Sequence, residues 1–209
     1  MNVVSVNIGG RSRLSLGGES VASGIFKSPT TQAYLTRTGF RGDVQVDIKN
    51  HGGVDKAVCV YSGDHFLFWK ASAGQLFGPG AFGENLTVTG LVEDDVRIGD
   101  VYSVGKTQLQ VSQPRQPCHK LSKKVGDPAF AGEVIKTGLT GFYFRVLVEG
   151  IVGPGDVITR ISSEASSCTI RFANDVMYRN REGAEDIEKL LSEPFLSDAW
   201  KGMLSLRCH

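Results

Sequence analysis

Short β-branched segments, separated by glycine-containing turns, run through most of the chain. Glycine makes up 26 of the 209 residues. The segments are residues 3–8, 44–48, 57–61, 85–88, 101–104, 108–112, 143–148 and 157–161. Many short strands joined by glycine-rich turns are typical of barrels and sandwiches, and not of doubly wound parallel sheets. We therefore expect a mainly β fold of the α+β class, closed into a barrel, over residues 1–162.

The last part of the chain has a different pattern. Residues 163–167 are small and polar, which is typical of a linker. Three helical patterns follow at about 169–178, 184–191 and 198–206, and Pro194 separates the last two. Within the β-rich part, residues 64–73 are the main helical candidate, with Asp64 as the capping residue. We predict a subdomain of three helices over residues 163–209.

Charge and cysteine content argue against several classes of protein. The net charge is +1, and the helical tail has no basic face, so we expect no nucleic acid partner. No apolar run approaches the about 20 residues that span a bilayer, and the N-terminus does not resemble a secretory signal. The four cysteines form no CxxC pair, which argues against zinc-finger and iron–sulfur sites, and they are too few for a disulfide framework in a chain of this length. We expect a cytoplasmic protein that binds no membrane.

The run QPRQPC at residues 113–118 is the strongest chemical feature. Its two prolines restrict the backbone, and Arg115 precedes the thiol of Cys118 by three residues. The basic residues that follow are Lys120, Lys123 and Lys124. Such surroundings favour the thiolate, the form that attacks electrophiles and ligates metals. A loop cysteine that happens to lie near basic residues is the alternative interpretation.

Two further motifs precede this run: HGGVDKAV at residues 51–58 and FGENL at residues 82–86. Gly52 and Gly53 permit backbone angles closed to other residues, and can let main-chain N–H groups approach an anion. Asn85 offers an amide with both a donor and an acceptor. The alternatives are a plain turn before a strand for the first motif, and a turn with left-handed Asn for the second.

In this order and at this spacing, the three motifs resemble the MOSC domain, which is named for the C-terminal part of molybdenum-cofactor sulfurases. The resemblance is closer to the small bacterial YiiM-like proteins, and it covers nearly the whole chain. It implies a MOSC-type β-barrel over residues 1–162 and a three-helix subdomain over residues 163–209. It also implies the molybdenum cofactor (Mo-molybdopterin), without dependence on pyridoxal phosphate.

The resemblance also implies roles for individual residues. Cys118 matches the molybdenum ligand of the reductase branch, and the persulfide carrier of the sulfurase branch. The residues expected to bind the cofactor are Arg115, His51, Gly52, Gly53, Lys27, Asn85 and Arg145. Cys59 alternates with valines in an apolar segment, and we interpret it as a small core residue.

The function implied is an oxidoreductase that reduces N-hydroxylated compounds, such as N-hydroxylaminopurines, hydroxylamines or amidoximes. The chain contains no internal flavin or iron–sulfur module, so we expect electrons from a separate flavoprotein, for which the helical tail is one docking surface. A homodimer is compatible with the sequence. Two alternatives stay open. The first is a non-catalytic carrier that binds the cofactor, or holds sulfur as a persulfide on Cys118. The second is a degenerate module that binds a partner through its tail.

Overall fold

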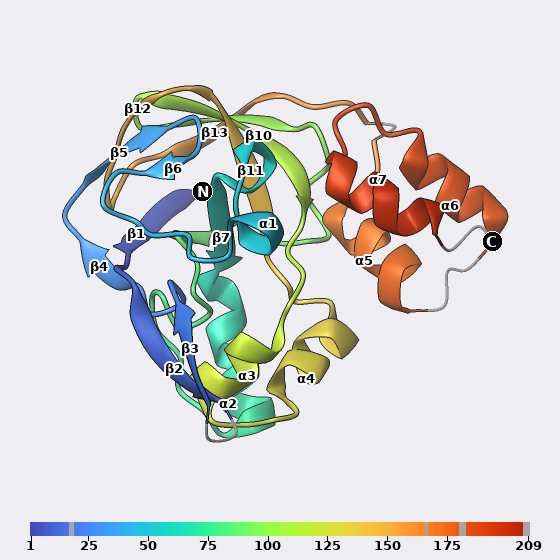
Figure 1. The fold of residues 1–209 in the computed structure, drawn as a ribbon. Coiled ribbons are helices and arrows are strands. Elements are labelled where there is room, and N and C mark those ends of the chain that lie inside the picture. The colour runs from blue at the N-terminus through green and yellow to red at the C-terminus, as the bar shows by residue number, and fades with distance from the viewer. Residues whose placement is uncertain (17–18, 166, 180–182, 207–209) are drawn as a thin grey trace.

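An eight-stranded sheet forms the centre of the molecule (Figure 1). The computed structural model describes residues 1–16, 19–165, 167–179 and 183–206. In spatial order the strands are β13 (Ile158–Ser162), β9 (Val101–Val104), β10 (Thr107–Pro114), β11 (Phe142–Val148), β7 (Val58–Ser62), β8 (Leu86–Thr89), β1 (Asn2–Ile8) and β4 (Ser28–Thr30). Among these described strands, β7 and β8 pair in parallel and the other neighbours pair antiparallel. The α+β class is confirmed.

The sheet is open, so the prediction of a closed barrel is wrong. The start of β1 does approach the segment before β13, through an isolated bridge between Asn2 and Val157. Further along the same edge, β1 pairs with β4 instead, for example at Val6–Thr30. Because β4 takes up the backbone groups of this edge, the contact with β13 cannot extend into a ladder. The sheet therefore curls back on itself without closing.

Two smaller sheets lie beside the main one. The first contains β12 (Gly150–Val152), β5 (Ala33–Thr36) and β6 (Gly39–Phe40), and the second is the hairpin of β2 (Ser12–Leu16) and β3 (Glu19–Ser23). The strand predicted at residues 44–48 does not form. Residues 44–46 form no regular element, and α1 (Ile48–His51) begins at Ile48. This irregular segment lines a cavity.

Helices gather in two places around the sheet (Figure 1). The first group comprises the short 3-10 helix η2 (Gly63–His65), with α2 (Phe66–Ala73), α3 (His119–Val125) and α4 (Phe130–Thr137). The 3-10 helix η1 (Val54–Lys56) lies apart from this group, against β10 and β11. The second is the predicted three-helix tail, which is confirmed as α5 (Ile170–Tyr178), α6 (Ala184–Leu191) and α7 (Asp198–Ser205). We call these three helices the helical unit. None of the described helices is long and apolar enough to cross a membrane.

Local sequence explains where several helices begin. Thr169 and Ser197 cap α5 and α7, because their side chains accept hydrogen bonds from Phe172 N and Trp200 N. The helix predicted at residues 64–73 is present as α2, but Asp64 does not cap it. Asp64 Oδ2 instead accepts a hydrogen bond from Gly90 N at 2.7 Å. This bond connects the residues before α2 to the residue that follows β8.

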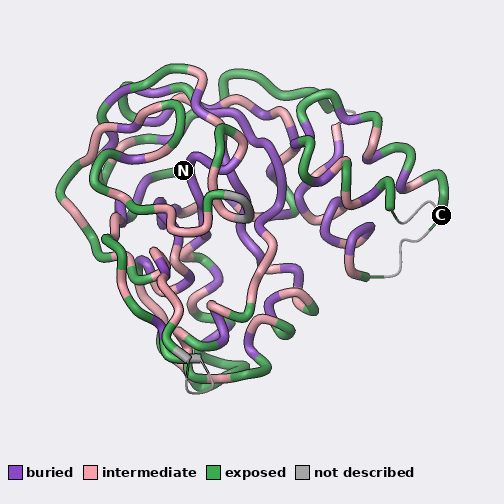
Figure 2. The backbone as a smooth tube through the Cα atoms, in the orientation of Figure 1, coloured by how far each residue is buried: buried purple, intermediate pink, exposed green. Residues whose placement is uncertain are grey.

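One hydrophobic cluster extends from the sheet into the helical unit. Phe144 of β11, Ile170 of α5 and Trp200 of α7 belong to it, and all three are fully buried. Figure 2 shows buried segments both in the strands of the sheet and in these helices. A second cluster, centred on Phe82, lies among α2, α3 and α4. The division into two domains at residue 162 stays a prediction, because the first cluster contains residues from both sides of it.

Candidate functional site

A cavity of about 90 Å³ lies where β7, β10 and the segment before α1 meet. Five of the predicted site residues line it: Lys27, His51, Asn85, Arg115 and Cys118. Among its other lining residues are Asp43, Asp47, Lys56, Cys59, Lys120 and Tyr143. Gly52, Gly53 and Arg145 do not line it. Segments far apart in the sequence therefore converge on one cavity, which we call the inner cavity.

Cys118 is one of the residues that line this cavity. It is a free, half-buried thiol in the residue just before α3, and its side chain makes no capping hydrogen bond to that helix. It lines the inner cavity and also an adjoining space of about 520 Å³, which we call the outer cleft. A ligand in either space could reach the sulfur.

Arg115 is a buried cation with an unused donor. Its residue is only 6% exposed, and its Nη2 donates to the backbone carbonyl of Phe82. Its Nη1 is buried and has no hydrogen-bond partner among the described residues. A buried donor without a partner costs free energy, so this nitrogen is suited to an acceptor supplied by a ligand.

Glu84 fixes the carbonyl that holds Arg115. Its carboxylate is fully buried and accepts from Gly80 N at 2.7 Å, Phe82 N at 2.9 Å and Thr87 Oγ1 at 2.7 Å. Burial raises the pKa of this carboxyl, while the hydrogen bonds oppose that rise. The FGENL motif thus forms a turn that the carboxylate of Glu84 stabilises by accepting hydrogen bonds from its backbone. This structural role of Glu84 was not predicted from the sequence.

Asn85 is occupied within the protein. Its Oδ1 accepts from Cys59 N at 3.2 Å, and its Nδ2 donates to Asp43 Oδ2 at 2.9 Å and to Asn7 O at 3.3 Å. Since both ends of the amide have partners, the geometry does not support the predicted reading of a cofactor by Asn85. We interpret it as a residue that anchors the cavity wall.

Lys27 lines the cavity as half of an ion pair. Its Nζ contacts both oxygens of Asp43, at 2.5 Å for Oδ2, and the two side chains are 7% and 3% exposed. Asp43 also accepts from Gly9 N at 2.9 Å. The lysine predicted from sequence is therefore present at the site, but a carboxylate that sequence reasoning missed offsets its charge.

His51 is held neutral by its surroundings. Burial and the nearby charge of Lys120, with smaller contributions from Arg115 and Lys56, lower the pKa of His51 to about 4, although Asp47 opposes this. A neutral imidazole can donate with one ring nitrogen and accept with the other. His51 can therefore make hydrogen bonds in the cavity without adding charge at neutral pH.

The two glycines after His51 shape the turn. The sequence suggested that the backbone N–H groups here could approach an anion. Gly52 N instead donates to Ile48 O at 3.0 Å, so this amide is already used within the protein. A Cβ at Gly52 would lie 2.9 Å from the backbone of Ile48, and Gly53 has a φ of 94°. Glycine is therefore needed at both positions by the backbone conformation of the turn that follows α1.

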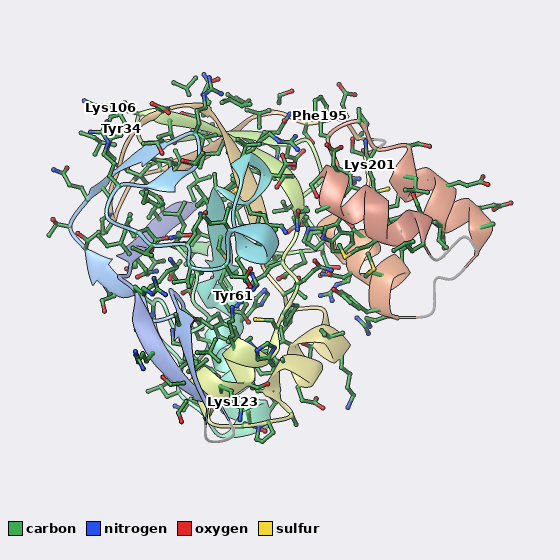
Figure 3. The ribbon with its side chains drawn as sticks, viewed as in Figure 1. Tyr34, Tyr61, Lys106, Lys123, Phe195 and Lys201 are labelled. Carbon is green, nitrogen blue, oxygen red and sulfur yellow. The ribbon has the colours of Figure 1, made fainter. Side chains whose placement is uncertain are left out.

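Arg145 belongs to an internal network outside the cavity. Its Nη2 lies 2.7 Å from Asp55 Oδ1, and its Nη1 donates to Gln110 Oε1 at 3.0 Å. It also donates to the backbone carbonyl of Phe195, which lies where the helical unit meets the sheet (Figure 3). The predicted cofactor contact by Arg145 gains no support, because the guanidinium instead fastens η1 to β10 and the segment before α7.

Cys59 is buried, as expected, but it also borders the inner cavity. Its neighbours Val58 and Val60 belong to the hydrophobic cluster, so strand alternation directs Cys59 to the opposite face, where it lines the inner cavity. Burial raises the pKa of the Cys59 thiol, although the charge of Arg115 opposes this. The alternating pattern was visible in the sequence, but it did not reveal which face was the core.

The inner cavity carries more cations than carboxylates. Lys56 and Lys120 join Lys27 and Arg115, whereas Asp43 and Asp47 are the carboxylates among the described lining residues. Lys120 Nζ lies 3.2 Å from Asp47 Oδ2, and burial lowers the pKa of Lys56, although Asp55 and Asp47 oppose this. A largely buried space with an excess of positive charge favours an anionic ligand.

The QPRQPC run contacts both the inner cavity and the helical unit. Arg115, Gln116 and Cys118 line the inner cavity, and the amides of Gln113 and Gln116 contact the helical unit. Ser197 Oγ donates to Gln113 Oε1 at 2.6 Å. Gln116 Nε2 donates to Tyr178 OH at 3.2 Å and contacts Met203 Sδ at 3.3 Å. The run therefore connects the site to α5 and α7.

Comparison with protein families gives two matches. The MOSC domain matches residues 47–159, and the YiiM-like 3-alpha helix domain matches residues 169–207. The uncharacterized protein YflK of Bacillus subtilis is 45% identical over 201 residues, covering 96% of this chain and 91% of that protein.

Two further proteins are informative. A protein called a reductase in Gibberella moniliformis is 36% identical over 162 residues, and the match spans 28% of its length and 75% of this chain. The crystal structure of YiiM from Geobacillus stearothermophilus superposes with a TM-score of 0.84 at 35% identity, covering 100% of this chain and 99% of that one.

Proposed function

The chain belongs to the MOSC domain family and carries the YiiM-like helical domain, and from this premise we propose that it is a molybdenum-cofactor-dependent oxidoreductase. The MOSC domain is related to the C-terminal part of molybdenum-cofactor sulfurases, and one relative is called a reductase. The proposed substrates are N-hydroxylated compounds such as N-hydroxylaminopurines. The proposed electron donor is a separate flavoprotein.

The buried, unpartnered Nη1 of Arg115 is the observation that carries the proposal. It borders a cavity that Cys118 also lines, and this cavity has an excess of cations. A phosphate is a strong acceptor for a guanidinium, and a thiolate is a soft ligand for a metal. The donor set therefore fits molybdopterin. Cys118 would ligate the metal, while Arg115, Lys56, Lys120 and His51 would hold the anionic end.

The proposed reaction is a two-electron reduction. The N–O bond breaks, two electrons and two protons are taken up, and the products are the amine and water. When bound, the cofactor supplies the centre that exchanges electrons and the oxygen atom. His119 and Lys120 line the outer cleft beside Cys118, and they are two side chains through which protons from solvent would approach.

Metal analysis tests this proposal directly. The protein is purified from a host that makes molybdenum cofactor, as wild type and as Cys118→Ala, and assayed for reduction of 6-N-hydroxylaminopurine with a flavoprotein donor. We expect near-stoichiometric molybdenum and activity in wild type, and loss of both in Cys118→Ala. Cys168→Ala is the matched control, because that thiol is buried away from the cavity in the cluster shared with the helices.

Folded wild-type protein that was exposed to the cofactor, yet holds no molybdenum and has no activity, would contradict the proposal. A labile sulfane sulfur on the same protein, lost in Cys118→Ala, would instead support the persulfide-carrier alternative.

A further inference from the structure

The outer cleft has two chemically different walls. On the sheet side it is lined by Cys118, His51, Lys56 and Lys120. On the helix side the lining residues are Ile135 of α4, Tyr178 of α5, and Ala199 and Met203 of α7. The first wall is polar and cationic, and the second is apolar and aromatic. The two walls therefore suit ligands of different chemistry.

Charge limits what this cleft can bind. Asp47 is the one carboxylate among the described residues that line it, and Lys120 already pairs with Asp47 at 3.2 Å. A positively charged amine would therefore meet cations without a compensating anion. The apolar wall likewise offers nothing to a small, strongly hydrated molecule such as hydroxylamine. A neutral, flat organic molecule suits the apolar and aromatic wall.

The helix-side wall is fixed in place relative to Cys118. Gln116, two residues before the thiol, donates to Tyr178 OH and contacts Met203 Sδ. The Tyr178 ring also packs edge-on against Trp200, with 6.5 Å between ring centroids. Because Trp200 is fully buried, it gives Tyr178 a rigid support. The wall is thus preorganised at a fixed position beside the sulfur.

We propose that Tyr178 and Met203 bind the heteroaromatic ring of an N-hydroxylated purine-type base, and that the helical unit determines substrate specificity. This inference rests on the proposed function of the same site. The Tyr178 ring offers an aromatic contact, and the Met203 sulfur is polarisable and packs favourably against aromatic rings. The volume of the cleft, about 520 Å³, falls in the range typical of sites for organic ligands. The cationic wall is left for the anionic cofactor.

Binding of adenine, the amine product of 6-N-hydroxylaminopurine, tests the proposal without turnover. Calorimetry is performed on wild type, Tyr178→Ala, Met203→Ala and the control Leu206→Ala, whose side chain is 79% exposed just after α7 and does not line the cleft. We expect the Kd for adenine to rise about tenfold in each cleft variant, and to stay unchanged in the control. Circular dichroism confirms that each variant is folded.

Kinetics on molybdenum-loaded protein provide a second readout. We expect the KM for 6-N-hydroxylaminopurine to rise about tenfold in Tyr178→Ala and Met203→Ala, with kcat and molybdenum content close to wild type. Tyr178→Phe keeps the ring and should keep most of the affinity.

The outcomes separate the two proposals. If wild type does not bind adenine, or if the cleft variants match wild type in Kd and KM, the specificity role of the helical unit is overturned, while the reductase assignment can still stand. If loaded wild type reduces no N-hydroxylated compound, the reductase assignment fails, and the adenine titration still decides whether this wall binds a base.

Discussion

The guanidinium of Arg115 is held from one side by the backbone carbonyl of Phe82, which leaves the other terminal nitrogen buried and unpaired at the inner cavity. The carbonyl is in turn fixed by Glu84, which accepts from the amide of the same phenylalanine. One terminal nitrogen of the guanidinium is thus used within the protein, and the other can bind a ligand.

Arg115→Lys keeps the positive charge but replaces the fork with one ammonium group, which cannot serve both the carbonyl and a ligand. We expect the molybdenum and pterin content to fall at least about tenfold, because a charge-assisted hydrogen bond contributes roughly 1.5–3 kcal/mol. Metal and pterin analysis after gel filtration measures this. Full cofactor content in the lysine variant would show that Nη1 is not used.

Asp43→Asn removes the carboxylate from a nearly buried ion pair and leaves Lys27 uncompensated. We expect a loss of about 3–5 kcal/mol in the free energy of unfolding, measured by urea denaturation. The control is Glu133→Gln. Its pair with Lys136 is exposed, at 51% and 77% of the two side chains, so a change of at most about 1 kcal/mol is expected. Equal effects of the two substitutions would contradict the prediction.

The lowered pKa of His51 predicts that the folded protein loses stability in acid. This pKa is about 4 in the folded protein, against 6.5 for an ordinary histidine. Between these values the unfolded chain takes up a proton and the folded chain does not. The free energy of unfolding therefore falls as pH falls from 6.5 to 4, by about 3 kcal/mol from this residue.

His51→Gln should remove this part of the pH dependence, and the exposed His119→Gln should not. Urea unfolding at pH 7, 5.5 and 4 compares the three proteins. A pH dependence in His51→Gln that matches wild type would mean that the imidazole is not buried neutral.

Arg145→Gln distinguishes a framework role from a cofactor contact. The substitution breaks the links to Asp55 and the carbonyl of Phe195, so we expect a loss of about 1–3 kcal/mol in the free energy of unfolding. Molybdenum content of the folded variant should equal that of wild type, in contrast to Arg115→Lys. If Arg145→Gln folds normally but loses the metal, the cofactor role first expected from sequence is restored.

Sequence patterns predicted most of the long strands and all three helices of the helical unit, because these segments combine clear periodicity with recognisable start and stop residues. The closed barrel was wrong, since nothing in the pattern of β1 shows that its second half pairs with β4. The valines of residues 44–46 suggested a strand, but they pass along a cavity where no neighbouring strand pairs with them.

The candidate site was predictable only in part, for physical reasons. Cys118, Arg115, His51 and Lys27 were identified from motifs, because their chemistry suits an anionic metal cofactor. Their hydrogen-bond and ion-pair partners lie in segments far away in the sequence. Asp43 pairs with Lys27, and Glu84 holds the Phe82 backbone whose carbonyl accepts from Arg115. Asn85 and Arg145 were assigned to the ligand, but tertiary contacts occupy their polar groups.

The hydrophobic cluster that joins the sheet to the helical unit has a consequence during synthesis. The residues of α5–α7 are the last described part to leave the ribosome, and until then the apolar face that Ile170 and Trp200 cover stays open to water. A chain interrupted before residue 169 would carry the complete QPRQPC run and yet expose this face, which makes it prone to aggregation and to capture by chaperones. The apolar face of a nascent chain is therefore covered only after α5, α6 and α7 have packed against the sheet.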